Sequence, residues 1–383
     1  LLNIDEKYSK VLNISIIYIS ILNFFTYSYS NFFSGPFSAF GYYHIYALIK
    51  VFRAATTLLI PAYSIFRGAT FIEAVYVLIF TEILSFFVHI FFSIKYFKKL
   101  SFKIYKPNFI LALKQLYLSF YILINYLIDF IKANGLRLIL ASIFSPLIVS
   151  YFVTLRIISN FIKFSIDSLR DPLFPKLMSS FKNNKRNVIV LIEIYWIISI
   201  AILSPILVLI QFLIPELFEM WTLNKIEFQP ILFSFLLMSL LFYSIYLPFD
   251  MILKGFNQNK TLLRINIVTI FIFLASLLVF HKFYSLIFIG IAIFLLEVIT
   301  SIFFYTYLKN FLKHKKININ KNFFYITNIL NAHTCILLFL ISVKELNNFF
   351  MIYIILIFTI IILFIPKFCS NETFKLIKKN LKY

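Results

Sequence analysis

The feature that most constrains this chain is a series of apolar stretches, each close to the ~20 residues that a helix needs to cross the hydrocarbon core of a bilayer. Charged residues make up only 13% of the 383 positions, well below their usual share in a soluble domain. Nothing alternates apolar and polar residues with a period of two, so helices remain as the way to satisfy the backbone in lipid. We identify eleven stretches, with the approximate limits 11–33, 43–66, 70–94, 108–131, 138–162, 188–213, 229–252, 262–281, 284–308, 322–342 and 348–366. The sequence therefore predicts an all-α integral membrane protein, a polytopic helical bundle.

Basic residues are unevenly shared between alternate connections of these spans. The chain has 36 Lys and Arg against 15 Asp and Glu, a formal net charge of +21. Roughly two thirds of the basic residues lie in one alternating set, which predicts that this set faces the cytoplasm. The set comprises 95–106, 163–186, 254–264, 309–321 and the tail from 367. The charge is thereby explained by topology, and we expect no nucleic-acid partner.

The same alternation predicts a multi-pass membrane protein with a cytoplasmic C-terminus. It places Leu1 outside the cytoplasm, so we expect an odd number of spans to precede it and a total of about 12–14. The outer connections are short, and the longest covers residues 214–228. We therefore expect the protein to act within the bilayer.

Several charged residues fall inside spans, where a charge at the helix centre costs about 2.5–3.5 kcal/mol and faces a partner or a wet cavity. Lys50 and Arg53 are three residues apart, on one face of the second span near its cytoplasmic end. They predict either a cationic wall for an anionic substrate or snorkelling to the headgroups. Spacings of 4, 3, 4 and 3 place a second set on one face of the fifth span. This set is Arg156, Asn160, Lys163, Asp167 and Arg170. Arg156 and Asn160 are the deepest, and we consider both as cavity-lining, substrate-binding candidates.

A further group of ionisable residues suits gating or coupling. Asp129 and Lys132 are three apart near the predicted outer surface, where residues 134–137 are expected to turn the chain. They predict an internal ion pair or, together with Arg137, an outer gate. The candidate coupling carboxylates are Glu82, which shares a face of the third span with His89, and the isolated Glu193 and Glu297. Each is either a proton-carrying group for coupled transport or a structural carboxyl with a partner.

Catalytic and ligand-binding motifs are absent from the sequence. It has no Gly-rich phosphate loop, no Gly-x-Ser-x-Gly elbow, no His-Glu-x-x-His and no histidine pair at metal-ligand spacing. We therefore expect a protein that is not an enzyme and that carries neither a cofactor nor a metal.

Two runs of residues carry a family resemblance. The first comprises Asn134 to Leu140, Ile143 to Phe152, Thr154-Leu155-Arg156 with Asn160, and Pro175 to Ser179, and the second is Leu253-Lys254-Gly255-Phe256-Asn257-Gln258-Asn259-Lys260. The first resembles the opening helices of the second lobe in Wzx-type polysaccharide flippases, members of the multidrug/oligosaccharidyl-lipid/polysaccharide exporter superfamily. The second is similar to a short cytoplasmic turn of that family.

The resemblance implies two helical lobes around a central cavity. It divides the chain into the remainder of a first lobe (1–105), a second lobe (106–308), and additional spans with a basic tail (309–383). It also implies a location in the bacterial inner membrane, and export across it of an undecaprenyl-diphosphate-linked oligosaccharide, an O-antigen or capsule repeat unit, by alternating access. Its partners would be this lipid-linked glycan, the bilayer and other membrane proteins of polysaccharide assembly. The alternatives are a cation-coupled multidrug exporter of the same superfamily and a membrane-embedded O-antigen polymerase.

Overall fold

The computed structural model of the chain describes residues 43–99, 108–168, 170–183, 185–280, 285–317 and 321–343, together with Thr373. Within these residues the regular structure is entirely helical. Nine helical segments there are long and apolar enough to cross a membrane. The prediction of an all-α polytopic membrane protein is confirmed, while the expected spans 11–33 and 348–366 lie outside the described residues.

The chain divides into two compact units, at a point close to the predicted boundary after residue 105. Unit 1 covers residues 1–107 and unit 2 covers residues 108–383. The boundary expected after residue 308 falls inside one unbroken helix of unit 2.

Unit 1 is described as two helices joined by a tight turn. They are α2 (Tyr43–Phe66) and α3 (Phe71–Lys99), which pack along each other. Gly68 follows α2 with φ of 91°, in the left-handed region that glycine adopts without strain. The backbone N–H of Thr70 then donates to Glu73 Oε2 at 2.7 Å, and Thr70 Oγ1 accepts from the Glu73 N–H at 3.4 Å. This capping box fixes the start of α3 and gives Glu73 a structural role.

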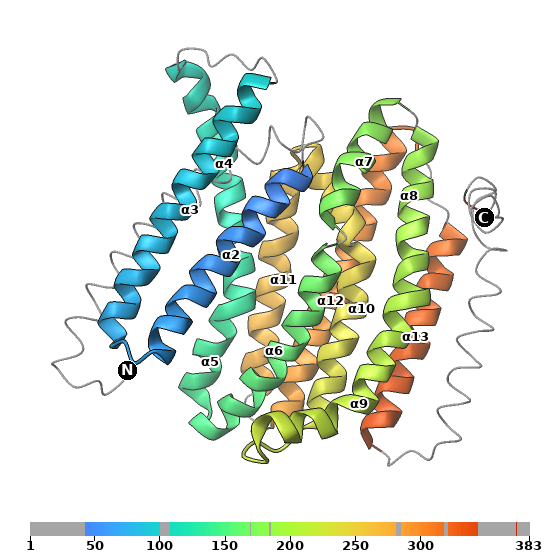
Figure 1. Cartoon of the computed structure of the whole chain (residues 1–383). Coiled ribbons are helices and arrows are strands. Elements are labelled where there is room, and N and C mark those ends of the chain that lie inside the picture. The colour runs from blue at the N-terminus through green and yellow to red at the C-terminus, as the bar shows by residue number, and fades with distance from the viewer. Residues whose placement is uncertain are drawn as a thin grey trace, which may run out of the picture. The chain divides into compact units, whose positions relative to one another are not determined.

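Unit 2 is a helical bundle with two π-helical segments. Its elements are α4 (Phe109–Phe130), η1 (Ile131–Gly135), α5 (Leu136–Ile143), α6 (Pro146–Ser168), α7 (Arg170–Asn183), α8 (Lys185–Ile198), η2 (Ser199–Leu203), α9 (Ser204–Thr222), α10 (Pro230–Gly255), α11 (Asn259–Phe280), α12 (Leu286–His314) and α13 (Lys321–Val343). Figure 1 shows α7 at the upper end of this unit and the connection from α5 to α6 at its lower end. Lys176 on α7 and Lys185 and Arg186 at the start of α8 belong to this upper end, which the charge pattern predicts to be cytoplasmic.

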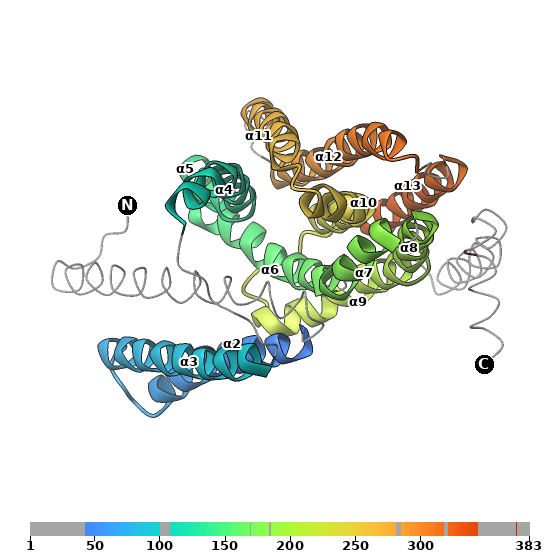
Figure 2. The ribbon, with the colours of Figure 1, turned by 90° about the horizontal axis from the view of Figure 1, so that it is seen from above.

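The apolar helix α10 forms the centre of unit 2. It packs against α12 and α13 most extensively and also against α6, α7, α8, α9 and α11, and Figure 2 shows it among these helices. Trp196 on α8 is fully buried, and its indole N–H donates to the Ile245 carbonyl of α10 at 3.0 Å. A buried indole needs such a partner, so this bond helps fix α8 against the central helix.

The predicted turn at residues 134–137 is wrong. The chain continues there from α4 through the π-helical η1 into α5, as one helical segment of about 52 Å. It turns instead at Phe144 and Ser145, directly before Pro146. Proline suits the first position of α6 because its missing N–H would have no helical partner there. Asp129 and Lys132 consequently lie in the middle of a long helix rather than near its end.

Candidate functional site

A polar cavity of about 290 Å³ lies within unit 2. Its lining residues come from α4, η1, α6, α7, α10, α11 and α12, which Figure 2 shows end on. The charged lining residues are five cations, Lys132, Arg156, Lys163, Arg170 and Lys254, and four acids, Asp129, Asp167, Asp250 and Glu297. So many charges inside an apolar bundle indicate a wet, functional cavity rather than a structural core.

The polar stripe on α6 provides one wall of this cavity. Arg156, Lys163, Asp167 and Arg170 all line it, whereas Asn160 does not. The helical spacing thus placed four of the five stripe residues together. Arg156 precedes the end of α6 by about 18 Å, so the wall runs from the end of the bundle to its middle.

A second wall comes from α10, which the sequence analysis missed. Tyr243, Tyr246, Asp250 and Lys254 line the cavity at spacings of 3, 4 and 4. This is the same helical-face pattern as on α6. It was detectable in the sequence, but α10 is so apolar elsewhere that its few polar residues gave a weak signal.

Three of the four cavity carboxylates have specific partners. Asp167 accepts a hydrogen bond from the Tyr243 hydroxyl, and Glu297 Oε2 accepts one from the Tyr246 hydroxyl at 2.7 Å. Asp250 Oδ2 lies 2.7 Å from Lys254 Nζ and 3.3 Å from a terminal nitrogen of Arg170.

Asp250 thereby joins α10 to the start of α7. Burial lowers the pKa of Arg170, and the neighbouring Asp250, Tyr243 and Asp167 together raise it above its ordinary value. The ion pairs at this end of the cavity therefore favour the charged form of Arg170.

Three cavity cations have no carboxylate within salt-bridge distance among the described residues. Lys132 Nζ donates to Asn266 Oδ1 at 3.2 Å and to Thr269 Oγ1 at 3.1 Å, both on α11. Lys163 Nζ lies 4.3 Å from the centre of the Tyr243 ring, a cation–π contact. The guanidinium of Arg156 forms no hydrogen bond with the described residues, and its Nε is buried.

The expected ion pair between Asp129 and Lys132 is not formed. Both line the cavity, but Lys132 points to α11, and Asp129 forms no salt bridge with the described residues. Asn266 also donates to Asn125 Oδ1 at 2.8 Å, so a chain of amide groups joins α4 to α11. These asparagines were not identified from the sequence, because single amides inside apolar spans give no periodic signal.

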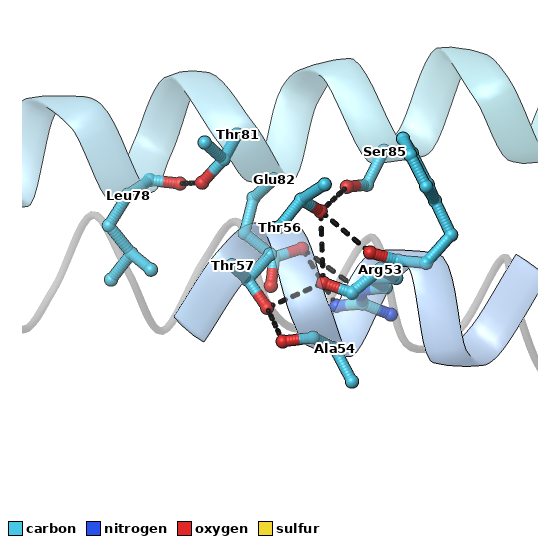
Figure 3. A network of polar contacts seen from close by, with 9 residues as sticks. Arg53, Ala54, Thr56, Thr57, Leu78, Thr81, Glu82 and Ser85 are labelled. Atoms are coloured by element: carbon cyan, nitrogen blue, oxygen red, sulfur yellow. Dashed lines mark hydrogen bonds and ion pairs between the residues drawn. The ribbon is translucent and has the colours of Figure 1, made fainter. Parts of the chain in front are cut away.

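In unit 1 the structure brings together two residues that were predicted separately. Arg53 Nε and a terminal nitrogen lie 3.1 and 2.8 Å from Glu82 Oε2, and both side chains are largely buried. Figure 3 shows this pair between α2 and α3, beside the contact of Thr56 Oγ1 with Ser85 Oγ at 3.3 Å. The geometry makes Arg53 and Glu82 mutual partners in a polar seam of unit 1.

The remaining predicted site residues lie elsewhere. Lys50 is exposed on α2, and Arg137 on α5 has a buried Nε without a hydrogen-bond partner among the described residues. Glu193 on α8 is 1% exposed, and its Oε2 accepts a hydrogen bond from Thr373 Oγ1 at 2.6 Å. The lining of the polar cavity includes none of these three.

Comparison with known proteins finds no relative of this chain. No family model matches the chain, and no curated protein or solved structure matches it significantly.

Proposed function

We propose that this chain is a flippase-type transporter that moves a lipid-linked oligosaccharide with an anionic diphosphate headgroup across the bacterial inner membrane. The cargo in this proposal is an O-antigen or capsule repeat unit on undecaprenyl diphosphate, as the resemblance to Wzx-type proteins implies, and movement is by alternating access. Transport of this kind breaks no bond and requires no catalytic group.

The observation that carries the proposal is the set of unpaired cations in the polar cavity. Among the described residues, Lys132, Arg156 and Lys163 have no carboxylate within salt-bridge distance. A buried charge without a partner is costly unless a ligand or water compensates it. An anion entering the cavity would supply the missing partner.

Arg156 is the residue best suited to a diphosphate. Its planar guanidinium can bind two phosphate oxygens in parallel, which a lysine cannot do. The cavity volume of about 290 Å³ is at the small end of the range for ligand pockets. We therefore assign the cavity to the headgroup alone.

A binding measurement on the purified full-length chain tests this assignment. The probe is a short-chain isoprenoid diphosphate, compared with an uncharged isoprenoid alcohol of the same length. Arg156→Met should weaken diphosphate binding by at least about tenfold, because a charge-assisted hydrogen bond is worth about 1.5–3 kcal/mol. Arg156→Lys should recover only part of the loss. Arg264, exposed on α11 outside the cavity lining, provides the matched control, and Arg264→Met should bind like the wild type. Equal binding of diphosphate and alcohol would contradict the proposal.

The cavity acids favour a second candidate, a cation-coupled exporter. Asp129 forms no salt bridge with the described residues, and Glu297 is bound only by the Tyr246 hydroxyl among them. Carboxylates in a wet membrane cavity are suited to binding protons or cationic substrates. The second candidate predicts tight binding of a lipophilic cation that is lost in Asp129→Asn and Glu297→Gln and unaffected by Arg156→Met.

A further inference from the structure

A second hollow in unit 2 is apolar and has a different construction. It has a volume of about 480 Å³ and lies between α6 and the segment formed by α8, η2 and α9. Both walls pack on α10, but they do not pack closely on each other among the described helices. The hollow is therefore a groove that runs between two separated helices.

Isoleucines at helical spacing form both walls. On the α8–η2–α9 side they are Ile198, Ile202, Ile206, Ile210 and Ile214, and on α6 they are Ile158, Ile162 and Ile166. A spacing of four residues makes successive members of each series neighbours on the helix surface. The floor is more polar, since Ser199 Oγ and Ser244 Oγ meet there at 2.6 Å. These hydroxyls satisfy each other, so the groove offers an apolar surface to its occupant.

Among the described residues of unit 2, the groove is open along its side. Phe161 and Ile202 on its rim are 73% and 53% exposed, and both belong to membrane-spanning segments. In the bilayer such a surface is accessible to hydrocarbon chains rather than to water. A chain lying in it would gain close packing on both sides.

The length of the groove distinguishes a short lipid hydrocarbon chain from a long one. The series from Ile198 to Ile214 extends over about 24 Å of helix. One leaflet of the hydrocarbon core is only about 15 Å thick. A phospholipid acyl chain therefore fills part of the groove, whereas a chain longer than one leaflet can occupy all of it.

We propose that this isoleucine groove binds the long isoprenoid tail of a polyprenyl lipid. The assignment deepens the proposed function and rests on it. The groove and the polar cavity lie on opposite faces of α6, because Ile158 and Ile162 line the groove while Arg156 and Lys163 line the cavity. Helix α6 is thus placed to contact both ends of one amphipathic substrate.

Photo-crosslinking on the full-length protein in lipid nanodiscs tests the proposal. One probe is a long-chain polyprenyl monophosphate with a diazirine in its tail, and the other is phosphatidylglycerol with a diazirine at the same depth. Mass spectrometry of the labelled peptides should show the polyprenyl probe on 158–166 and 198–214. Excess unlabelled polyprenyl phosphate should compete, and phosphatidylglycerol should label these segments no more than other lipid-facing helices.

Two matched substitutions control for general effects on the protein. Ile202→Trp fills the groove and should reduce polyprenyl labelling of both segments by about fivefold or more. Ile302 on α12 is similarly exposed, at 56%, and lies outside the groove, so Ile302→Trp should leave labelling unchanged. Both sites are exposed enough to accept the larger ring without disturbing the core.

Three outcomes would overturn the proposal. Equal labelling of the groove by both probes would show that the groove binds ordinary acyl chains. Labelling by neither probe would show that the groove is closed or is filled by another part of the polypeptide. Labelling that persists in Ile202→Trp would place the tail elsewhere. The probe has no glycan and needs no transport, so groove labelling without glycan movement would refute the proposed function alone.

Discussion

Replacing Arg156 with methionine should make the protein more stable, although the residue is partly buried in the middle of unit 2. Arg156 has no hydrogen-bond partner among the described residues, and a charge at the centre of a membrane helix costs about 2.5–3.5 kcal/mol. The nearby Glu297 offsets part of that cost. Methionine keeps the length of the side chain and removes the charge. We expect a gain of about 1–2 kcal/mol in the free energy of unfolding.

The same substitution at Arg170 should lower the free energy of unfolding. Arg170 lies 3.3 Å from Asp250, which is 7% exposed, and Arg170→Met leaves that carboxylate with Lys254 alone. A loss of about 1 kcal/mol follows, less than for a fully buried pair because Arg170 is partly exposed. The same Arg→Met substitution is thus predicted to raise the free energy of unfolding at Arg156 and to lower it at Arg170, although both residues belong to one stripe of α6 and α7.

Thermal unfolding in detergent measures both effects, with the fluorescence of the buried Trp196 as the signal. Midpoint shifts of a few degrees, about +2 to +4 °C for Arg156→Met and a decrease for Arg170→Met, correspond to these energies. Arg264→Met, at an exposed position, should leave the midpoint unchanged. A midpoint that falls in Arg156→Met as far as in Arg170→Met would show that Arg156 is a structural residue, and would refute the reasoning that Arg156 serves an anion.

Three further predictions concern packing, a cavity hydrogen bond and sidedness. Gly255→Ala should lower the free energy of unfolding by about 1–3 kcal/mol, because a new Cβ would collide with the thioether of Met178; adding Met178→Ala should restore part of the loss in a double-mutant cycle. Tyr246→Phe removes the 2.7 Å hydrogen bond to the partly buried carboxylate of Glu297 on α12 and should lower the free energy of unfolding by about 1–2 kcal/mol in thermal unfolding. A cysteine at the exposed Ser179 should resist a membrane-impermeant thiol reagent in intact cells, whereas one at the exposed Asn224 should react; the reverse pattern would invert the topology.

Hydrophobic patterning predicted the helices well because each span must be apolar over its whole length. The limits 43–66 agree with α2, and 229–252 agrees closely with α10 (Pro230–Gly255). The failure at residues 134–137 has a specific cause. Asn134 and Gly135 are turn-forming residues in most contexts, but here they belong to a π-helical segment that continues the helix. Local propensity could not reveal that the flanking helices remain collinear.

The candidate site was predictable only where a helical face carried several polar residues. The stripe from Arg156 to Arg170 was found because its members share one face of successive turns. Pairings across helices were not predictable, since a single sequence does not say which helices are neighbours. The pair of Arg53 with Glu82 and the bonds from Lys132 to α11 are of this kind.

Glycan-lipid movement in reconstituted vesicles is the most direct test of the proposed function. The measurement follows a fluorescent oligosaccharide on a polyprenyl diphosphate, with a membrane-impermeant quencher reporting how fast the label crosses between leaflets. The account predicts crossing that depends on the wild-type protein and slows by at least about tenfold in Arg156→Met at equal protein incorporation. Crossing in wild-type vesicles no faster than in protein-free vesicles, or equally fast with Arg156→Met, would contradict it.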